Sequence, residues 1–104
     1  MFGGGMGIAV REIIANGMAF RCREAAGSGE PVILLHGFPE TSHMWLPLME
    51  RLRAEGYRCL APDQRGYSAG ARPEEAGHYR YIDTASDALA LAGAWDADRF
   101  HLIG

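Results

Sequence analysis

Residues 32–39 read Val-Ile-Leu-Leu-His-Gly-Phe-Pro, and they contain a backbone group that is suited to chemistry. Four consecutive apolar residues cannot alternate between two faces, so they predict a strand covered on both sides, as in a parallel sheet. Gly37 lets the backbone leave the sheet sharply, and Pro39 ends any regular continuation. The amide of Phe38 is then left without an internal partner. A fixed donor at the carboxyl end of a parallel strand is suited to stabilise a developing oxyanion.

A second polar segment, Asp-Gln-Arg-Gly-Tyr at residues 63–67, directly follows another short apolar run at residues 57–62. The run predicts a further strand, so this segment also lies at a carboxyl strand end, where open α/β sheets bind their ligands. Arg65 is interpreted as a buried ion-pair partner of Asp63, or of a backbone carbonyl, in preference to a substrate contact.

The two segments together resemble a known family. His-Gly-Phe-Pro at residues 36–39 and Asp-x-Arg-Gly at residues 63–66 are similar to motifs that follow the third and fourth strands in the α/β-hydrolase superfamily. The resemblance covers nearly all of residues 18–104. At the level of the branch, His-Gly-Phe-Pro-Glu is most similar to the epoxide hydrolases and the related dehalogenases.

This resemblance implies roles for the candidate site residues. The amide of Phe38 is implied to be one of two oxyanion-hole donors, the other coming from the residue after the nucleophile. Gly37 and Pro39 shape the oxyanion turn, and His36 and Arg65 are implied to hold it. Taken without the second segment, His-Gly-Phe-Pro is also compatible with a tight turn that merely caps a strand.

Two positions depart from the family pattern. Ser68 stands where the family usually has Gly after the Asp-x-Arg-Gly-Tyr segment, and Gly70 comes two residues later. Phe38 stands where haloalkane dehalogenases usually have Asn. The first departure leaves the conformation of the loop open, and the second disfavours the dehalogenase interpretation without excluding it.

The resemblance also implies that the catalytic triad lies elsewhere. Gly104 occupies the place of the first Gly in a Gly-x-nucleophile-x-Gly elbow, so the nucleophile, the acid and the His base are expected beyond it. An Asp nucleophile would suit epoxides or halides and a Ser would suit esters, and both remain open. The other Ser and His residues lack an elbow or an adjacent base, and surface or packing roles are expected for them: Ser42, Ser68, Ser86, His43, His78 and His101.

Strand and turn signals outline the elements that must position these groups. Two antiparallel strands over residues 8–15 and 18–25 are predicted to flank a hairpin turn at Asn16-Gly17. Further strands are predicted over residues 32–36, 57–62 and 100–103. The predicted fold class is α/β, the N-terminal half of an α/β-hydrolase fold, with a mostly parallel sheet, an antiparallel N-terminal hairpin and helices on both faces.

Two helices are predicted between these strands. A short turn over residues 42–45 is expected to lead into a helix that runs to about Glu55 and ends at Gly56. A second helix is predicted with one apolar face toward the sheet and with two carboxylates on the far side. The apolar face consists of Ile82, Ala85, Leu89 and Ala92, and the carboxylates are Asp83 and Asp87.

Composition sets the broad class of the protein. The 104 residues are 48% hydrophobic and 22% charged, with a formal net charge of -3, which argues against a disordered tail and against nucleic-acid binding. Residues 1–7 are predicted to be a flexible Gly-rich leader before a single domain portion over residues 8–104. No bilayer-spanning run or secretory signal is seen, so a cytoplasmic protein without membrane contact is expected. Neither a cofactor nor a metal is predicted, and Cys22 and Cys59 are expected as small buried hydrophobes.

Two functional hypotheses follow. In the first, the chain is the N-terminal portion of a hydrolase that acts on a small epoxide, ester or carbon-halogen substrate, to which it supplies the oxyanion turn. In the second, it is a catalytically inactive half-domain that self-associates through its exposed last strand.

Overall fold

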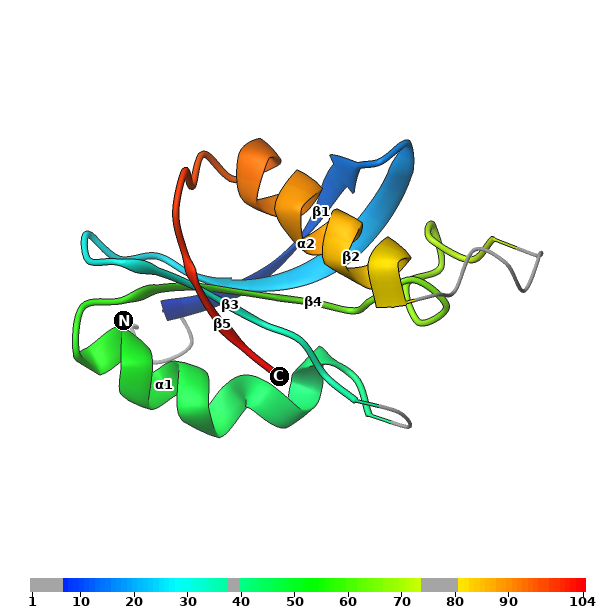
Figure 1. Cartoon of the computed structure of the whole chain (residues 1–104). Helices are drawn as coiled ribbons and strands as arrows, with labels where there is room; N and C mark the ends of the chain where they lie inside the picture. The colour runs from blue at the N-terminus through cyan, green and yellow to red at the C-terminus, as the bar shows by residue number, and fades with distance from the viewer. Residues whose placement is uncertain (1–6, 38–39, 74–80) are drawn as a thin grey trace.

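The computed structural model describes residues 7–37, 40–73 and 81–104, which form one mixed sheet with helices on both faces (Figure 1). The predicted leader therefore lies outside the described residues except for Gly7. The order of the five strands is β1-β2-β4-β3-β5. The predicted α/β class and the placement of helices on both faces are confirmed.

The N-terminal hairpin consists of β1 (Ile8–Ala15) and β2 (Met18–Ala25), which pair antiparallel along their whole length. Asn16 and Gly17 join them with φ angles of 51° and 71°. Both angles lie in the left-handed region, which Asn and Gly tolerate best, and a two-residue hairpin turn of this type requires it at both positions. The predicted hairpin and its turn are confirmed.

Three short strands make the parallel part of the sheet. β3 (Pro31–Leu34) lies parallel to both β4 (Arg58–Pro62) and β5 (His101–Ile103), while β4 also pairs antiparallel with β2. The strand predicted over residues 32–36 thus begins and ends earlier than expected. The ladder to β5 still continues through Leu35, whose amide donates to the carbonyl of Ile103 at 2.8 Å. His36 lies beyond the strand, at its carboxyl end.

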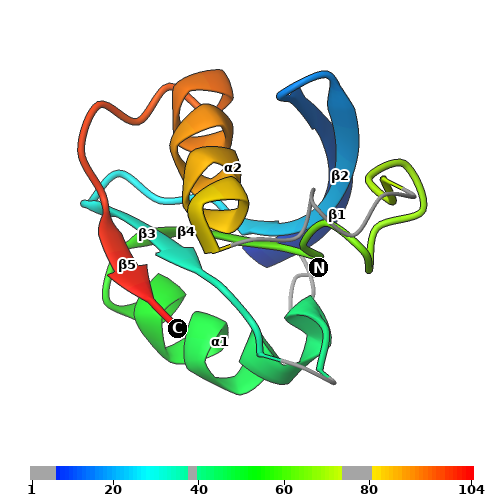
Figure 2. The ribbon, with the colours of Figure 1, turned by 45° about the vertical axis from the view of Figure 1, so that its right-hand side comes forward.

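One face of the sheet is covered by η2 (Ser42–Trp45) and α1 (Leu46–Ala54), as predicted (Figure 2). The side chain of Thr41 accepts from the amide of His43 and so caps η2. Gly56 follows α1 with a φ of 94°, which confirms it as the residue that ends the helix. Met49 is fully buried and anchors α1 on a cluster of strand residues: Ala25, Val32, Leu34, Cys59 and Ala61.

The opposite face is covered by α2 (Tyr81–Ala94), but not with the predicted side of the helix. Ile82 and Leu89 are 64% and 66% exposed, so their predicted contact with the sheet is wrong. The buried side instead consists of Asp87, Ala88, Leu91 and Ala92, followed by Trp95. Two forces turn the helix this way, because Trp95 and Leu91 bury more apolar area than the predicted set and Asp87 is drawn inward by an ion pair with Arg65.

The two cysteines lie on opposite faces of the sheet, Cys22 toward α2 and Cys59 toward α1, and both are free and fully buried. Their predicted role as small buried hydrophobes is confirmed. In the described part of the chain, no helix combines the length and the apolar character needed to cross a bilayer.

Candidate active site

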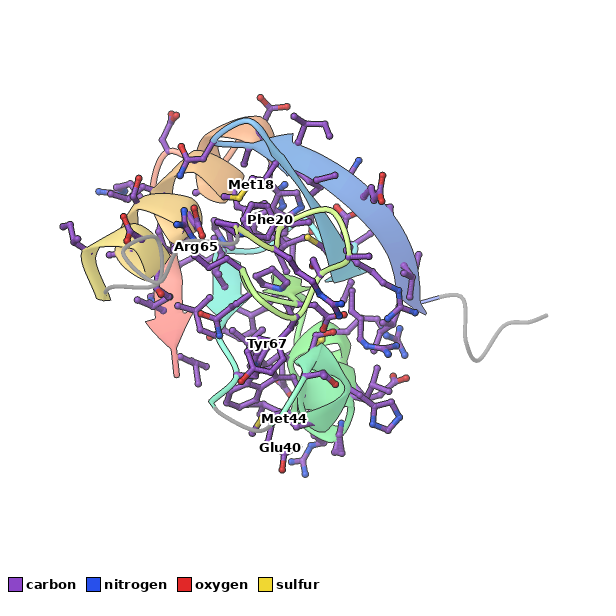
Figure 3. All side chains as sticks on the ribbon, turned by 90° about the vertical axis from the view of Figure 1, so that its right-hand side faces the viewer. Met18, Phe20, Glu40, Met44, Arg65 and Tyr67 are labelled. Carbon is purple, nitrogen blue, oxygen red and sulfur yellow. The ribbon has the colours of Figure 1, made fainter. Side chains whose placement is uncertain are left out.

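The candidate site lies where the polar segments after β3 and β4 meet, at the carboxyl ends of the two strands. Figure 3 looks at this end of the sheet, with Arg65 and Tyr67 in the middle of the view, Met18 and Phe20 on one side, and Glu40 and Met44 on the other. Since β3 and β4 are parallel neighbours, the residues that follow them are brought to one edge, as predicted.

His36 and Gln64 join the two segments through a pair of hydrogen bonds. The backbone amide of Gln64 donates to Nε2 of His36 at 3.0 Å, and the side-chain amide of Gln64 donates to the His36 carbonyl. A backbone amide can only donate, so Nε2 carries no proton in this arrangement and the neutral imidazole is protonated on Nδ1. Nδ1 lies 3.2 Å from the carbonyl of Gly37, where it can donate. His36 is 6% exposed, and its ring meets Tyr67 edge-on at 4.6 Å.

Asp63 is the second connecting residue. Its Oδ1 accepts from the backbone amide of Ser42 at 2.8 Å, and its Oδ2 lies 3.4 Å from Nη1 of Arg21. The carboxylate is 6% exposed, and such a buried charge is tolerated only when its oxygens have partners. Asp63 therefore connects the start of η2 to the end of β4.

Ser68, which departs from the family pattern, has a defined role in the loop. Its hydroxyl donates to the carbonyl of Asp63 and accepts from the backbone amide of Arg21 at 3.0 Å. The side chain is 1% exposed. A Gly at this position would leave the Arg21 amide without its side-chain partner, so the hydroxyl accounts for Ser here.

The predicted pairing of Arg65 with Asp63 is wrong. Arg65 donates instead to both carboxylate oxygens of Asp87 in α2, each at 2.7 Å. The pair is buried, as the interpretation of Arg65 as a structural ion-pair residue requires. Asp63 is directed toward Ser42 and Arg21, so its oxygens already have partners on the other side of the loop.

Phe38 and Pro39 lie outside the described residues, and the predicted roles of the Phe38 amide and of Pro39 stay predictions. The two residues that flank them are described. Gly37 is exposed, and its carbonyl accepts from the amide of Glu40 at 2.7 Å. The chain thus turns back on itself immediately after His36.

Comparison with known proteins decides the family. Residues 30–104 match the family model of the alpha/beta hydrolase fold. The chain belongs to the α/β hydrolase fold family. An epoxide hydrolase from Caballeronia sordidicola is 35% identical over 98 residues, which cover 94% of this chain and 30% of that protein. Epoxide hydrolase A from Mycobacterium tuberculosis is 38% identical over 95 residues, which cover 90% of this chain and 30% of that protein.

Solved structures agree with this assignment. A crystal structure of an epoxide hydrolase from Vigna radiata superimposes on this α/β hydrolase chain with a TM-score of 0.86 at 33% identity, covering 96% of this chain and 32% of the other. A fluoroacetate dehalogenase from Burkholderia is also similar, with 38% identity over 81 residues that cover 75% of this chain and 26% of that protein. The chain spans about 30% of the length of the curated relatives that it matches most extensively.

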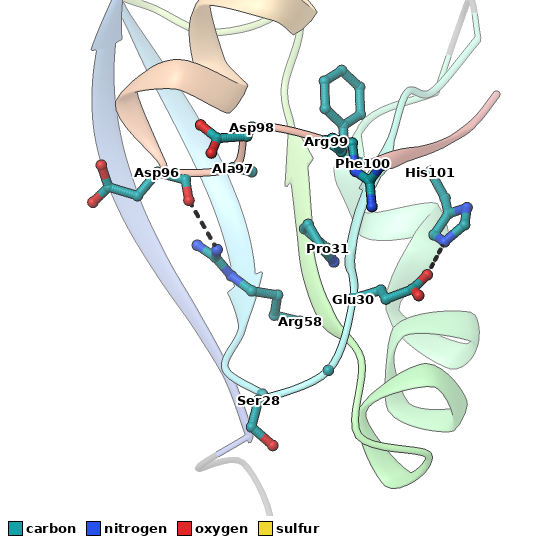
Figure 4. Close-up of a pocket in the computed structure, with 12 residues that line it drawn as sticks. Ser28, Glu30, Pro31, Arg58, Asp96, Ala97, Asp98, Arg99, Phe100 and His101 are labelled. Carbon is teal, nitrogen blue, oxygen red and sulfur yellow. Dashed lines mark hydrogen bonds and ion pairs between the residues drawn. The ribbon is translucent and has the colours of Figure 1, made fainter.

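A hollow of about 780 Å³ lies at the opposite end of the α/β hydrolase sheet (Figure 4). Residues 27–31 and 96–101 line it together with Arg58, at the amino ends of β3, β4 and β5. Arg58 stacks over Trp95 at 4.0 Å from the ring centroid and donates to its carbonyl at 2.6 Å. These contacts hold the loop before β5 in place. Ligands of open α/β sheets bind at the carboxyl ends, so the hollow is not the candidate active site.

The remaining candidate side chains are dispersed. His43 and Ser86 are exposed, His101 is an exposed partner of Glu30, and His78 lies outside the described residues. Within the described ranges, no three His, Cys, Asp or Glu side chains gather as a metal site would require. Sequence reasoning missed the link from Gln64 to His36. A signal for it existed, because both residues directly follow predicted strands.

Proposed function

We propose that this chain is the N-terminal portion of an α/β-fold hydrolase that acts on a small epoxide, ester or carbon-halogen substrate. In this proposal the chain supplies the oxyanion turn, and a segment outside these 104 residues supplies the nucleophile, the acid and the base. The observation that carries it is the pair of bonds between His36 and Gln64, which fixes the residue before the turn at the carboxyl edge of the sheet. The names of the relatives, epoxide hydrolases and a fluoroacetate dehalogenase, support the substrate class.

The role of the turn follows from the chemistry of the two nucleophile types. An Asp carboxylate that attacks an epoxide carbon opens the C–O bond and forms an alkyl-enzyme ester, which water then hydrolyses. A Ser hydroxyl attacks an ester carbonyl directly and expels the alcohol. In both routes a tetrahedral intermediate carries negative charge on one oxygen, and the backbone amide of Phe38 donates to that oxygen. Neither route needs a cofactor.

The backbone donor can be tested by removing it without changing the rest of the turn. A chimera is made in which this chain replaces the matching 30% of the Caballeronia sordidicola epoxide hydrolase. Phe38→Pro removes the N–H, while the matched control Phe38→Ala keeps it. Loss of one oxyanion donor should lower kcat on styrene oxide or p-nitrophenyl acetate by about 10²- to 10³-fold in Phe38→Pro relative to Phe38→Ala. Equal activity of the two folded chimeras would refute the proposal.

The chain alone provides a second test. Its turnover of styrene oxide and p-nitrophenyl acetate should be indistinguishable from that of its Phe38→Ala variant, because the nucleophile lies outside it in this proposal. Activity that disappears on changing Ser42, Ser68 or His43 would show that the chain contains its own nucleophile or base.

One observation favours a second candidate, an inactive half-domain that pairs with a second copy of itself. In the described sheet β5 pairs on one side only, and on this strand Leu102 is 56% exposed, with the exposed Leu89 on α2. An open apolar edge is a template for pairing with another chain. Sedimentation velocity over a dilution series should then show a dimer that Leu102→Lys weakens. Ile14→Lys, at the opposite edge of the sheet and 65% exposed, is the matched control. A monomer at all concentrations would exclude this candidate.

A further inference from the structure

The chain around the oxyanion turn is held at both ends by two consecutive residues of one loop. On the side before the turn, His36 is bonded to the backbone and side chain of Gln64. On the side after it, the amide of Ser42 donates to the carboxylate of Asp63 at 2.8 Å. The two anchors therefore move together with the end of β4.

Burial makes these anchors specific. His36, Ser42 and Asp63 are 6%, 1% and 6% exposed, so water cannot replace the partners that they lose. A hydrogen bond to an ionised carboxylate is about twice as strong as a neutral one, and leaving its buried donor unsatisfied costs free energy. The Ser42 amide is such a donor, because it opens η2 and has no carbonyl of an earlier turn to bond.

Two arginines of β2 complete the anchor after the turn. Arg21 lies 3.4 Å from Oδ2 of Asp63, and Nε of Arg23 donates to Oγ of Ser42 at 3.1 Å. They are two residues apart on one strand, so their side chains project from the same face. The carboxylate and the serine are thus each fixed from a third direction.

We propose that Asp63 is a positioning residue for the oxyanion turn, which it acts on through the backbone of Ser42. Its carboxylate sets where the chain re-enters the fold after the turn, and Gln64 sets where the chain leaves β3. The functional meaning of this arrangement rests on the proposed hydrolase function. The arrangement itself can be measured on the 104-residue chain without any turnover.

Amide hydrogen exchange followed by NMR tests the proposal in variants. Asp63→Ala should speed exchange at Ser42 by about tenfold or more beyond any change at Ile33 and Leu60 in the core, because it removes a charged acceptor from a buried donor. Asp63→Asn keeps one acceptor oxygen and should restore much of the protection. Asp98→Ala, which removes an exposed loop carboxylate, is the control and should leave Ser42 unchanged. Unchanged exchange at Ser42 in Asp63→Ala, or the same acceleration at all three amides, would overturn the proposal.

A measurement on the unmodified chain keeps the proposal testable if a variant does not fold. A scalar coupling across the hydrogen bond, from the Ser42 amide nitrogen to the carboxylate carbon of Asp63, should be detectable, and its absence in the folded chain would overturn the proposal. Failure of the hydrolase function would show differently. In that case the Phe38→Pro and Phe38→Ala chimeras would have equal activity while the coupling and the exchange at Ser42 still behaved as expected.

Discussion

The guanidinium of Arg65 donates to both carboxylate oxygens of Asp87, each at 2.7 Å, and this pair joins the loop after β4 to the middle of α2. Asn16, in the hairpin turn, adds a third hydrogen bond to Asp87 at 2.8 Å. Three segments that are far apart in the sequence therefore converge on one carboxylate. Its side chain is 7% exposed and that of Arg65 is 9% exposed, so solvent screens the pair only weakly.

Removing one partner of this pair should destabilise the fold strongly. We expect Asp87→Asn to lower the free energy of unfolding by about 3–5 kcal/mol, because it leaves the guanidinium of Arg65 buried without a compensating charge. Urea denaturation at neutral pH measures the change. The matched control is Glu50→Gln, which breaks the exposed pair with Arg53 at 2.9 Å and should cost less than about 1 kcal/mol. Similar losses in the two variants would contradict the structural role of the buried pair.

The two buried thiols should make stability depend on alkaline pH. Burial raises the pKa of Cys22 to about 12, with a smaller contribution from the negative charge of Asp63, and burial raises the pKa of Cys59 to about 11. A group whose pKa is higher in the folded chain stabilises that chain fully below its unfolded pKa, which is about 8.5 for a thiol. This contribution is lost as the pH rises from there through the folded values.

We therefore expect the free energy of unfolding to fall between about pH 8.5 and pH 11. Tyrosines titrate in the same range, so the comparison is with the double variant Cys22→Ala and Cys59→Ala, in which the fall should be smaller. Alkylation by iodoacetamide at pH 8 should be slow in the folded chain and fast in urea. Equal pH dependence in the two proteins, or rapid alkylation of the folded chain, would contradict the assignment of buried neutral thiols.

The exposed pair of Glu30 and His101 gives a prediction of direction only. The hydrogen bond from His101, and then its charge, lower the pKa of Glu30. A lowered carboxyl pKa stabilises the fold above the unfolded value and ceases to do so as the pH falls through the folded one. The carboxyl carbon of Glu30, followed by NMR, should titrate at higher pH in His101→Ala. His43→Ala is the control and should leave the titration unchanged, whereas an unchanged titration in His101→Ala would show that the pair does not form.

Features fixed by local backbone geometry could be predicted from the sequence. The turn at Asn16-Gly17 and the helix end at Gly56 were predictable because left-handed backbone angles select these residue types. The turn over Ser42–Trp45 was predictable because Pro47 is accepted only in the first turn of the helix that follows. Each of these predictions depends on a few neighbouring residues.

The orientation of α2 and the partner of Arg65 could not be predicted in the same way. The spacing of Ile82 and Leu89 is as helical as that of Ala88 and Leu91, so periodicity alone does not decide which side packs on the sheet. The decision depends on a contact with a loop 22 residues earlier, where Arg65 pairs with Asp87. Similarly, the sequence placed His36 at the strand end, but the link to Gln64 appears only once β3 and β4 are neighbours.

Two glycines of similar composition context should respond in opposite ways to an added methyl group. Gly93 lies in the exposed part of α2, and a Cβ there would meet no atom within 4 Å. Gly93→Ala should raise the free energy of unfolding by about 0.5–1 kcal/mol, because Gly loses more backbone freedom than Ala in a helix. At Gly27, a Cβ would lie 2.5 Å from the carbonyl oxygen of Tyr57 and 2.7 Å from that of Gly56.

These oxygens belong to the backbone and cannot move aside as a side chain would. Gly27→Ala should therefore lower the free energy of unfolding by about 1–3 kcal/mol, through the backbone shift that the methyl group forces. Urea denaturation of the two variants under the same conditions provides the comparison, and each variant serves as the control for the other. A loss of stability in Gly93→Ala would mean that its side of α2 is covered by other residues in solution. A neutral Gly27→Ala would mean that the loop before β3 does not approach the start of β4 as closely as described.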